Sequence, residues 1–272
     1  MSLKNEFRMM VTDLTAKYSI PPISNIFFPP FSKGGQPKEA EFMALSLAGG
    51  AAGISYVLLP DGKEKEYTAL QPPDFVGQNP RRFALEFGHD DPIQAMISLA
   101  AINAICQHVM RETKFPVDSA TDSLGLLSVA AGDKLGMVGL FFPLIKSINK
   151  VGAELVVIEK NASLIQNYPE LPITLDAMEL NSCNKVLCTS TAILNNSLDE
   201  ILSHCAPDAI VSVIGPTAGY FPDPLFNRGV DVVGGRVVKD GALFIKLLTE
   251  QKRWGEATQK TCFQKQIYNG II

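Results

Sequence analysis

Polar residues gather directly after two apolar runs in the second half of the chain. The tripeptide Thr189-Ser190-Thr191 closes the first run, with Asn195 shortly behind it, and Gly215-Pro216-Thr217 closes the second. Hydroxyl and amide groups beside a helix N-terminus can hold an anion or a carboxylate, and glycines let a ligand approach the backbone. Capping of the next helix by Asn196 explains only one of these polar residues. A plain turn is an equally weighted alternative for Gly215-Pro216-Thr217.

A partial glycine pattern and a carboxylate follow two earlier apolar runs. Gly136 and Gly139 lie in the first run, Phe141 follows it, and Glu159 closes the second run twenty residues after Gly139. Dinucleotide-binding folds often place a ribose-binding carboxylate at such a distance, and this Glu could hold a hydroxyl or a cation. The full G-x-G-x-x-G fingerprint is absent, so tight packing of the strand on its helix is the favoured explanation of the glycines.

One asparagine lies inside a long apolar segment. Asn103 sits in the middle of residues 92–112, with Leu99 and Ala100 on the same helical face. A buried Asn needs hydrogen-bond partners for its amide. Those partners are either structural groups or a ligand, and the sequence favours neither.

Familiar catalytic and metal-binding patterns are missing. The chain has no G-x-S-x-G elbow, no Walker loop and no C-x-x-C pair. Of its histidines, His108 lies in the apolar segment, His204 ends a predicted helix, and His89 is better explained by surface capping. The sequence therefore identifies no catalytic residue and no metal ligand, although a hard cation bound by oxygen atoms is left open.

Composition limits the class of protein. The 272 residues are 46% apolar and 19% charged, with a net charge of −4 and no basic stripe, so we expect a globular protein that does not bind nucleic acid. Five scattered cysteines indicate free thiols in a reducing cytosol. No signal peptide and no uninterrupted membrane-length run are evident, so the protein is expected to be cytoplasmic, with no membrane partner.

The polar residues of the second half need a parallel sheet to position them. Residues 132–160 read as a strand, a helix that begins at Pro143 and stops at Gly152, and a second strand. Further strands are predicted at 185–189, 209–214 and 230–233, with helices at 197–204 and 243–251. Such alternation predicts a doubly wound sheet, whose ligands bind beyond the carboxyl ends of the strands.

The first half has a different pattern. An amphipathic helix over residues 7–18 precedes strands predicted at 23–28, 42–48, 54–59 and 66–70, with Pro60-Asp61-Gly62 as a hairpin turn. Residues 71–82 read as a surface loop, and a buried helix begins at Pro92 with Asp91 as its N-cap. Residues 115–128 read as a linker with a short helix.

Several motifs together resemble a known family. They are Leu99–Ala104, Gly136–Pro143, Thr189-Ser190-Thr191 with Asn195, Gly215-Pro216-Thr217 and Arg228–Gly235. The chain resembles the putative heavy-metal chelation family, a group of prokaryotic proteins whose third-strand motif more often reads Thr-Gly-Thr. The resemblance implies an α+β domain like the enolase N-terminal fold over residues 1–115. It also implies a Rossmann-like domain over residues 116–272, an α/β fold overall, and a site between the domains.

We therefore expect a small-ligand or metal-binding protein with an inter-domain cleft. The alternative is an enzyme that uses a nucleotide-type cofactor or an anionic small-molecule substrate there. A metal ion is the cofactor that the resemblance implies, and a homo-oligomer is left open. The predicted ligand-binding residues are Asn103, Gly139, Phe141, Glu159, Thr189, Thr191, Asn195, Gly215, Pro216 and Thr217.

Overall fold

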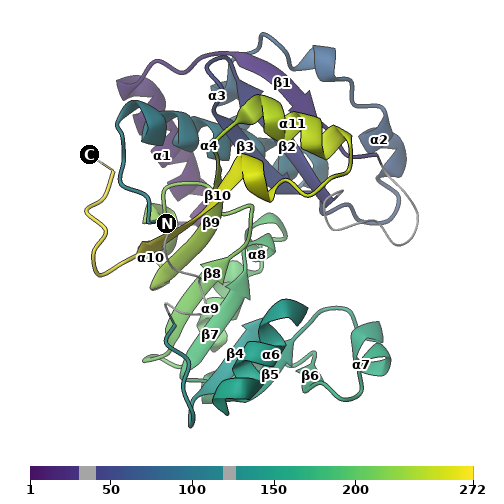
Figure 1. Cartoon of the computed structure of the whole chain (residues 1–272), viewed down its shortest axis with the longest axis vertical. Helices are drawn as coiled ribbons and strands as arrows, with labels where there is room; N and C mark the ends of the chain where they lie inside the picture. Colours follow the sequence, from purple (N-terminus) through teal and green to yellow (C-terminus); the bar gives the residue numbers. More distant parts are fainter. Residues whose placement is uncertain (31–40, 119–126, 272) are drawn as a thin grey trace.

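The protein contains a small antiparallel sheet and a larger, mostly parallel sheet (Figure 1). The computed structural model describes residues 1–30, 41–118 and 127–271. The small sheet has the order β1-β2-β3, from β1 (Ile23–Phe27), β2 (Phe42–Leu47) and β3 (Ala52–Tyr56). The large sheet has the order β10-β9-β8-β7-β4-β5-β6, and only β10 runs antiparallel to its neighbour. The predicted α/β fold class, with its smaller first part, is confirmed.

The larger sheet follows the predicted alternation of strands and helices. Its strands are β4 (Lys134–Val138), β5 (Glu154–Ile158), β6 (Ile173–Thr174), β7 (Lys185–Thr189), β8 (Ile210–Ile214), β9 (Val232–Val238) and β10 (Thr258–Gln264). The helical segments between them are α6 (Phe142–Val151), α7 (Ser163–Asn167), η3 (Ala177–Ser182), α8 (Thr191–Leu194), α9 (Leu198–His204), α10 (Asp223–Phe226), α11 (Gly241–Thr249) and η4 (Gly255–Ala257). Pro143 lies in the first turn of α6, and Gly152 ends that helix in the left-handed conformation, as predicted.

Two strands of this sheet were not predicted. The edge strand β6 has only two residues, too few for a recognisable pattern. The edge strand β10 alternates poorly, because four of its seven residues are Thr, Gln or Lys before Cys262 and Phe263. Short or polar edge strands carry a weak sequence signal, although they limit edge-to-edge pairing.

The first half contains more helix than its sequence predicted. Its helical segments are α1 (Leu3–Lys17), α2 (Glu64–Thr68), η2 (Pro72–Asp74), α3 (Pro80–Ala84) and α4 (Pro92–Glu112). The strand predicted at 66–70 is wrong, since this segment is α2, and Pro60-Asp61-Gly62 therefore closes no hairpin. Acidic residues in the first turn of α2 favour a helix, and only Tyr67 is buried, with its hydroxyl donating to Pro29 O. The surface loop predicted at 71–82 contains η2 and the start of α3. The short helix predicted within 115–128 falls largely outside the described residues.

The helix α4 is the core of the first half. It begins as predicted, with the Asp91 side chain accepting from Ile93 N and Pro92 in the first turn. Gly53 allows β3 to lie directly on this helix, because a Cβ there would meet Ala100 O at 2.0 Å. By length and composition α4 could cross a membrane, but 89% of its apolar window is buried inside the protein, as in a core helix.

The chain returns to the small sheet near its C-terminal end. Phe244 and Leu248 of α11 share a hydrophobic cluster with Ala44 of β2 and Ile54 of β3, together with Trp254. Figure 1 shows α11 lying over β1, β2 and β3. The predicted boundary at residues 115/116 stays a prediction, and the packing of α11 shows that the two parts are interleaved beyond it.

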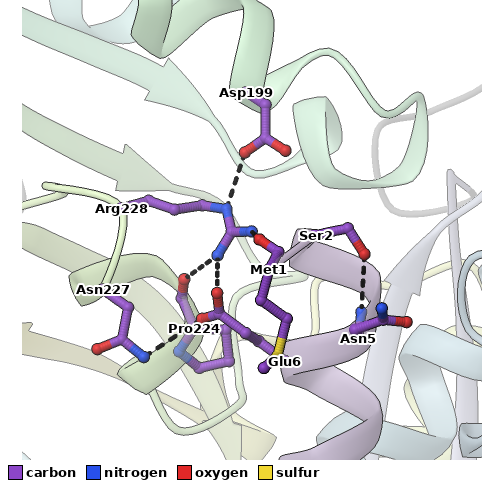
Figure 2. Close-up of polar contacts among 8 residues, drawn as sticks. All are labelled: Met1, Ser2, Asn5, Glu6, Asp199, Pro224, Asn227 and Arg228. Atoms are coloured by element: carbon purple, nitrogen blue, oxygen red, sulfur yellow. Dashed lines mark hydrogen bonds and ion pairs between the residues drawn. The ribbon is translucent and has the colours of Figure 1, made fainter.

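A second connection joins the two parts on another side of the molecule. Arg228 Nη1 lies 2.6 Å from Glu6 Oε1 of α1, and its Nε lies 2.8 Å from Asp199 Oδ1 of α9 (Figure 2). The same guanidinium donates to Pro224 O, and Asn227 Nδ2 donates to Glu6 Oε2. These contacts link α1 to α9 and α10 and so hold the two sheets in one relative position.

Candidate functional site

A cavity of about 580 Å³ lies where the carboxyl ends of β4, β7 and β8 meet the small sheet. The larger sheet contributes Leu140, Phe141, Thr189, Ser190, Thr191, Gly215, Pro216 and Thr217 to its lining. The small sheet contributes Phe42 and Tyr56, with Glu41 just before β2. Arg236 of β9 and the segment Arg253–Gly255 complete the wall.

Most of the predicted ligand-binding residues line this cavity. They are Phe141, Thr189, Thr191, Gly215, Pro216 and Thr217. Each of them follows or ends a strand, and the strands β4, β7 and β8 are parallel neighbours, so their carboxyl ends share one edge. Ligands of open parallel sheets bind at this edge, and these residues lie together there.

The hydroxyl groups at the end of β7 differ in their availability. Thr189 Oγ1 and Thr191 Oγ1 lie 2.8 Å apart and hydrogen-bond each other. Ser190 Oγ lies against Gly215, at 2.2 Å from the position that a Cβ of residue 215 would take. Within the described residues the Ser190 hydroxyl has no hydrogen-bond partner, so it remains available to a ligand. Ser190 was not among the predicted site residues, although it lies between two that were.

Asn103 lies behind the cavity wall and does not line it. Its side chain is fully buried, and Nδ2 donates to Ile54 O and to Thr217 O, each at 2.7 Å. Thr217 Oγ1 in turn accepts from Tyr56 N at 3.1 Å. These hydrogen bonds hold the loop after β8 against β3, as in the structural alternative. Asn103 Oδ1 has no hydrogen-bond partner among the described residues, and a ligand contact of Asn103 stays a prediction.

Three further predicted residues support the cavity from outside its lining. Glu159 accepts from Leu140 N at 2.7 Å and from Lys160 N, so its carboxylate holds the loop after β4. Gly139 has φ +85°, and a Cβ there would crowd the Thr189 side chain.

Asn195 also lies outside the lining. Its Oδ1 accepts from the backbone N–H and the hydroxyl of Ser197, directly before α9. This corrects the expectation that Asn196 caps that helix. Asn196 instead adopts a left-handed φ of +57°.

The aromatic and cationic wall was not predicted from the sequence. Trp254 packs edge-on against Phe42 and Phe244, at centroid distances of 5.7 and 5.5 Å. The Arg236 guanidinium lies 5.1 Å above the Trp254 ring, and its Nη1 donates to Thr258 Oγ1 at 2.7 Å. No local motif marks these residues, because they meet only when β9 and η4 pack against the small sheet.

The electrostatics of the cavity favour an anion. Arg236 is half-buried, burial lowers its pKa, and no carboxylate of the described residues forms an ion pair with it. Arg253 adds an exposed cation at the edge of the same cavity. Among the described residues of the lining Glu41 is the single acidic one, and the pKa of nearby Tyr56 is raised by burial first and by Glu41 second. Two cations against one carboxylate leave this described part of the lining with a net positive charge.

The residues that the structure describes do not fit a heavy-metal centre. They contain no group of three or more His, Cys, Asp or Glu side chains that could hold a metal ion. Burial raises the pKa of the Cys106 thiol to about 12 and that of Cys205 to about 11, so both stay protonated at neutral pH. Soft metals bind thiolates, and the cavity contributes none.

Comparison with known proteins gives a match to one family and two solved structures with a similar fold. The model of the DUF364 family, described as "putative heavy-metal chelation", matches residues 122–265. A DUF364 protein of unknown function from Pyrococcus horikoshii superimposes with a TM-score of 0.73 at 16% identity, covering 97% of this chain and 100% of that one. A second, from Desulfitobacterium hafniense, has a TM-score of 0.69 at 20% identity, with 96% and 98% covered.

One curated relative is also similar in sequence. An uncharacterized protein of Methanocaldococcus jannaschii is 23% identical over 177 residues, which are 62% of this chain and 66% of that protein. The chain thus matches just under two thirds of the length of this relative. At these identities the solved structures establish the fold alone.

Proposed function

We propose, from the premise that this chain belongs to the DUF364 family, that it binds a small organic anion in the cavity between its two sheets. The observation that carries this proposal is the half-buried Arg236, which lines the cavity without a carboxylate partner among the described residues. Withdrawing a charge from water is costly unless the charge is paired. A bound anion would supply that pairing.

The remaining lining suits an organic anion better than an inorganic one. Ser190 offers a hydroxyl group at the end of β7, where it can bind an oxygen atom of a ligand. Phe42, Tyr56 and Trp254 line the cavity with aromatic surface. Ligand sites commonly combine apolar walls with a few polar groups that set orientation.

Two alternatives have less support. Metal chelation by the chain's own side chains lacks a ligand set among the described residues. A dinucleotide needs free N–H groups where α6 begins, but Pro143 has none, and Leu144 N donates to Phe141 O. Glu159, at the position of a ribose-binding carboxylate, already accepts two backbone N–H groups.

The single tryptophan of the chain permits a direct test. Trp254 lines the cavity, so ligand binding should change its fluorescence. We expect saturable changes with organic acids and none with divalent metal ions. Arg236→Gln should abolish the response, whereas Arg82→Gln, on the exposed side of α3 and away from the cavity, should leave it intact. Saturation by metal ions alone, or equal binding by the Arg236→Gln variant, would refute the proposal.

A further inference from the structure

We propose that the ligand is a carboxylate on a flat, unsaturated body, bound side-on by the free edge of the Arg236 guanidinium. This inference rests on the proposed function and specifies the class of anion that the cavity accepts. Three observations carry it: the hydrogen bonding of Arg236, its position over Trp254, and the distribution of charge and aromatic rings in the lining.

The guanidinium of Arg236 has one occupied and one free edge. Its Nη1 donates to Thr258 Oγ1 at 2.7 Å. Neither Nε nor Nη2 has an acceptor in the described part of the chain, and neither is among the buried nitrogens that lack a partner. Both nitrogens therefore keep some exposed surface, and Arg236 lines the cavity. Their two N–H groups run parallel along one edge, which matches the two oxygens of a carboxylate.

The position of this guanidinium is set before a ligand arrives. It lies 5.1 Å over the Trp254 ring, and that ring is held between Phe42 and Phe244. Thr258 holds the opposite end of the guanidinium by the Nη1 hydrogen bond. A guanidinium held by a cation–π contact and by one hydrogen bond loses little freedom when it binds a planar group.

The charges in the lining favour one negative charge over two. Arg236 is the half-buried cation, and Arg253 is exposed to solvent, which screens it. With the Glu41 carboxylate, the described residues of the lining hold two cationic side chains and one acidic one, a net charge of +1. A monoanionic carboxylate therefore fits this arrangement better than a phosphate.

The aromatic rings determine the body of the ligand. Phe42, Tyr56 and Trp254 form one wall in edge-to-face contact, and Phe141 enters the lining from the end of β4. Aromatic side chains bind flat rings by stacking or edge-to-face contact. A cavity of about 580 Å³ accommodates a bicyclic ring together with its carboxylate.

Isothermal titration with four probes tests this inference: naphthoate, naphthamide, decahydronaphthoate and naphthyl phosphate. Naphthoate should bind best, and naphthamide, which lacks the charge, about tenfold or more weakly. Decahydronaphthoate keeps the carboxylate but loses the flat ring and should bind about two- to tenfold more weakly. Arg236→Lys keeps the charge but loses the two-nitrogen edge, so naphthoate affinity should fall about tenfold or more. Arg82→Lys, a matched change at an exposed arginine of α3 outside the cavity lining, should stay within about twofold.

A second pair of variants covers the case in which Arg236→Lys unfolds. Thr258→Val frees the guanidinium from its hydrogen bond and should weaken naphthoate binding, whereas Thr258→Ser retains the hydroxyl and should not. Unchanged binding in Arg236→Lys, or in Thr258→Val if Arg236→Lys does not fold, overturns the side-on carboxylate. Tighter binding of naphthyl phosphate than of naphthoate also overturns it, but leaves an anion site in place. If none of the four probes and no other organic acid binds, the proposed function fails as well.

Discussion

The side-chain amide of Asn103 joins the buried helix α4 to the loop after β8, through a hydrogen bond of 2.7 Å from Nδ2 to Thr217 O. The same nitrogen donates to Ile54 O of β3. One amide thus connects the two sheets directly behind the cavity wall. The residue has no contact with the cavity, yet it holds the Thr217 segment that lines it.

Replacing Asn103 should affect stability and ligand binding together. Asn103→Ala leaves the carbonyls of Ile54 and Thr217 without their donor, which should lower the free energy of unfolding by about 1–3 kcal/mol. Binding of an organic acid should weaken too, because the Thr217 loop loses its support. Urea unfolding and the Trp254 titration measure the two effects, with the exposed Asn149→Ala as control. A destabilised variant with unchanged affinity would show that Asn103 does not position the loop.

Gly215 and Ser190 should behave as a coupled pair. Gly215 has φ +148°, and an added Cβ would lie 2.2 Å from Ser190 Oγ. Gly215→Ala should therefore cost about 1–3 kcal/mol of stability through crowding. Adding Ser190→Gly removes the clashing hydroxymethyl group and should recover part of that loss, which a double-mutant cycle of thermal unfolding detects. Strictly additive effects would contradict the contact.

The Arg228 connection should contribute to stability. Arg228 and Glu6 have side chains that are only 11% and 15% exposed, and removal of one partner leaves the other charge poorly solvated. Arg228→Met should therefore lower the free energy of unfolding by about 3 kcal/mol. Chemical denaturation measures this loss, and Arg82→Met, at an exposed arginine, should have almost none. An equal loss of stability in the two variants would mean that the Arg228 contacts in Figure 2 contribute no more to the free energy of unfolding than an exposed arginine does.

Acid should destabilise the protein partly through Asp133. Its carboxylate lies 2.9 Å from Lys185 Nζ and accepts from Asn184 Nδ2 and Ala130 N. The hydrogen bond from Lys185 is the largest cause that lowers the pKa of Asp133 to about 2, from 3.8. A lowered pKa stabilises the fold above pH 3.8, and this contribution is lost as the pH falls from there through about 2. Asp133→Asn should be less stable at pH 7 and should lose less stability in acid. Parallel stability curves from pH 7 to 2 for the two proteins would contradict this.

The predictions of secondary structure were correct where the hydrophobic pattern and the capping residues indicate the same element. The crossover from β4 through α6 to β5 was readable from apolar runs, Pro143 and Gly152, and α4 from Asp91 and Pro92. Prediction failed at α2, where Tyr67 and Thr68 after a turn motif suggested a strand, but the segment pairs with no strand of the described part of the chain. A segment of five residues has too little periodicity to overrule its surroundings.

The sequence by itself determined the polar half of the candidate site. Residues that end parallel strands must meet at one edge of the sheet, so Thr189, Gly215 and Thr217 could be grouped before the structure was known. Only the tertiary structure placed Arg236 and Trp254 in the same cavity and moved Asn103 behind its wall. The physical reason is distance along the chain: Asn103 and Thr217 are 114 residues apart, and spacing reports local periodicity but not which distant surfaces pack together.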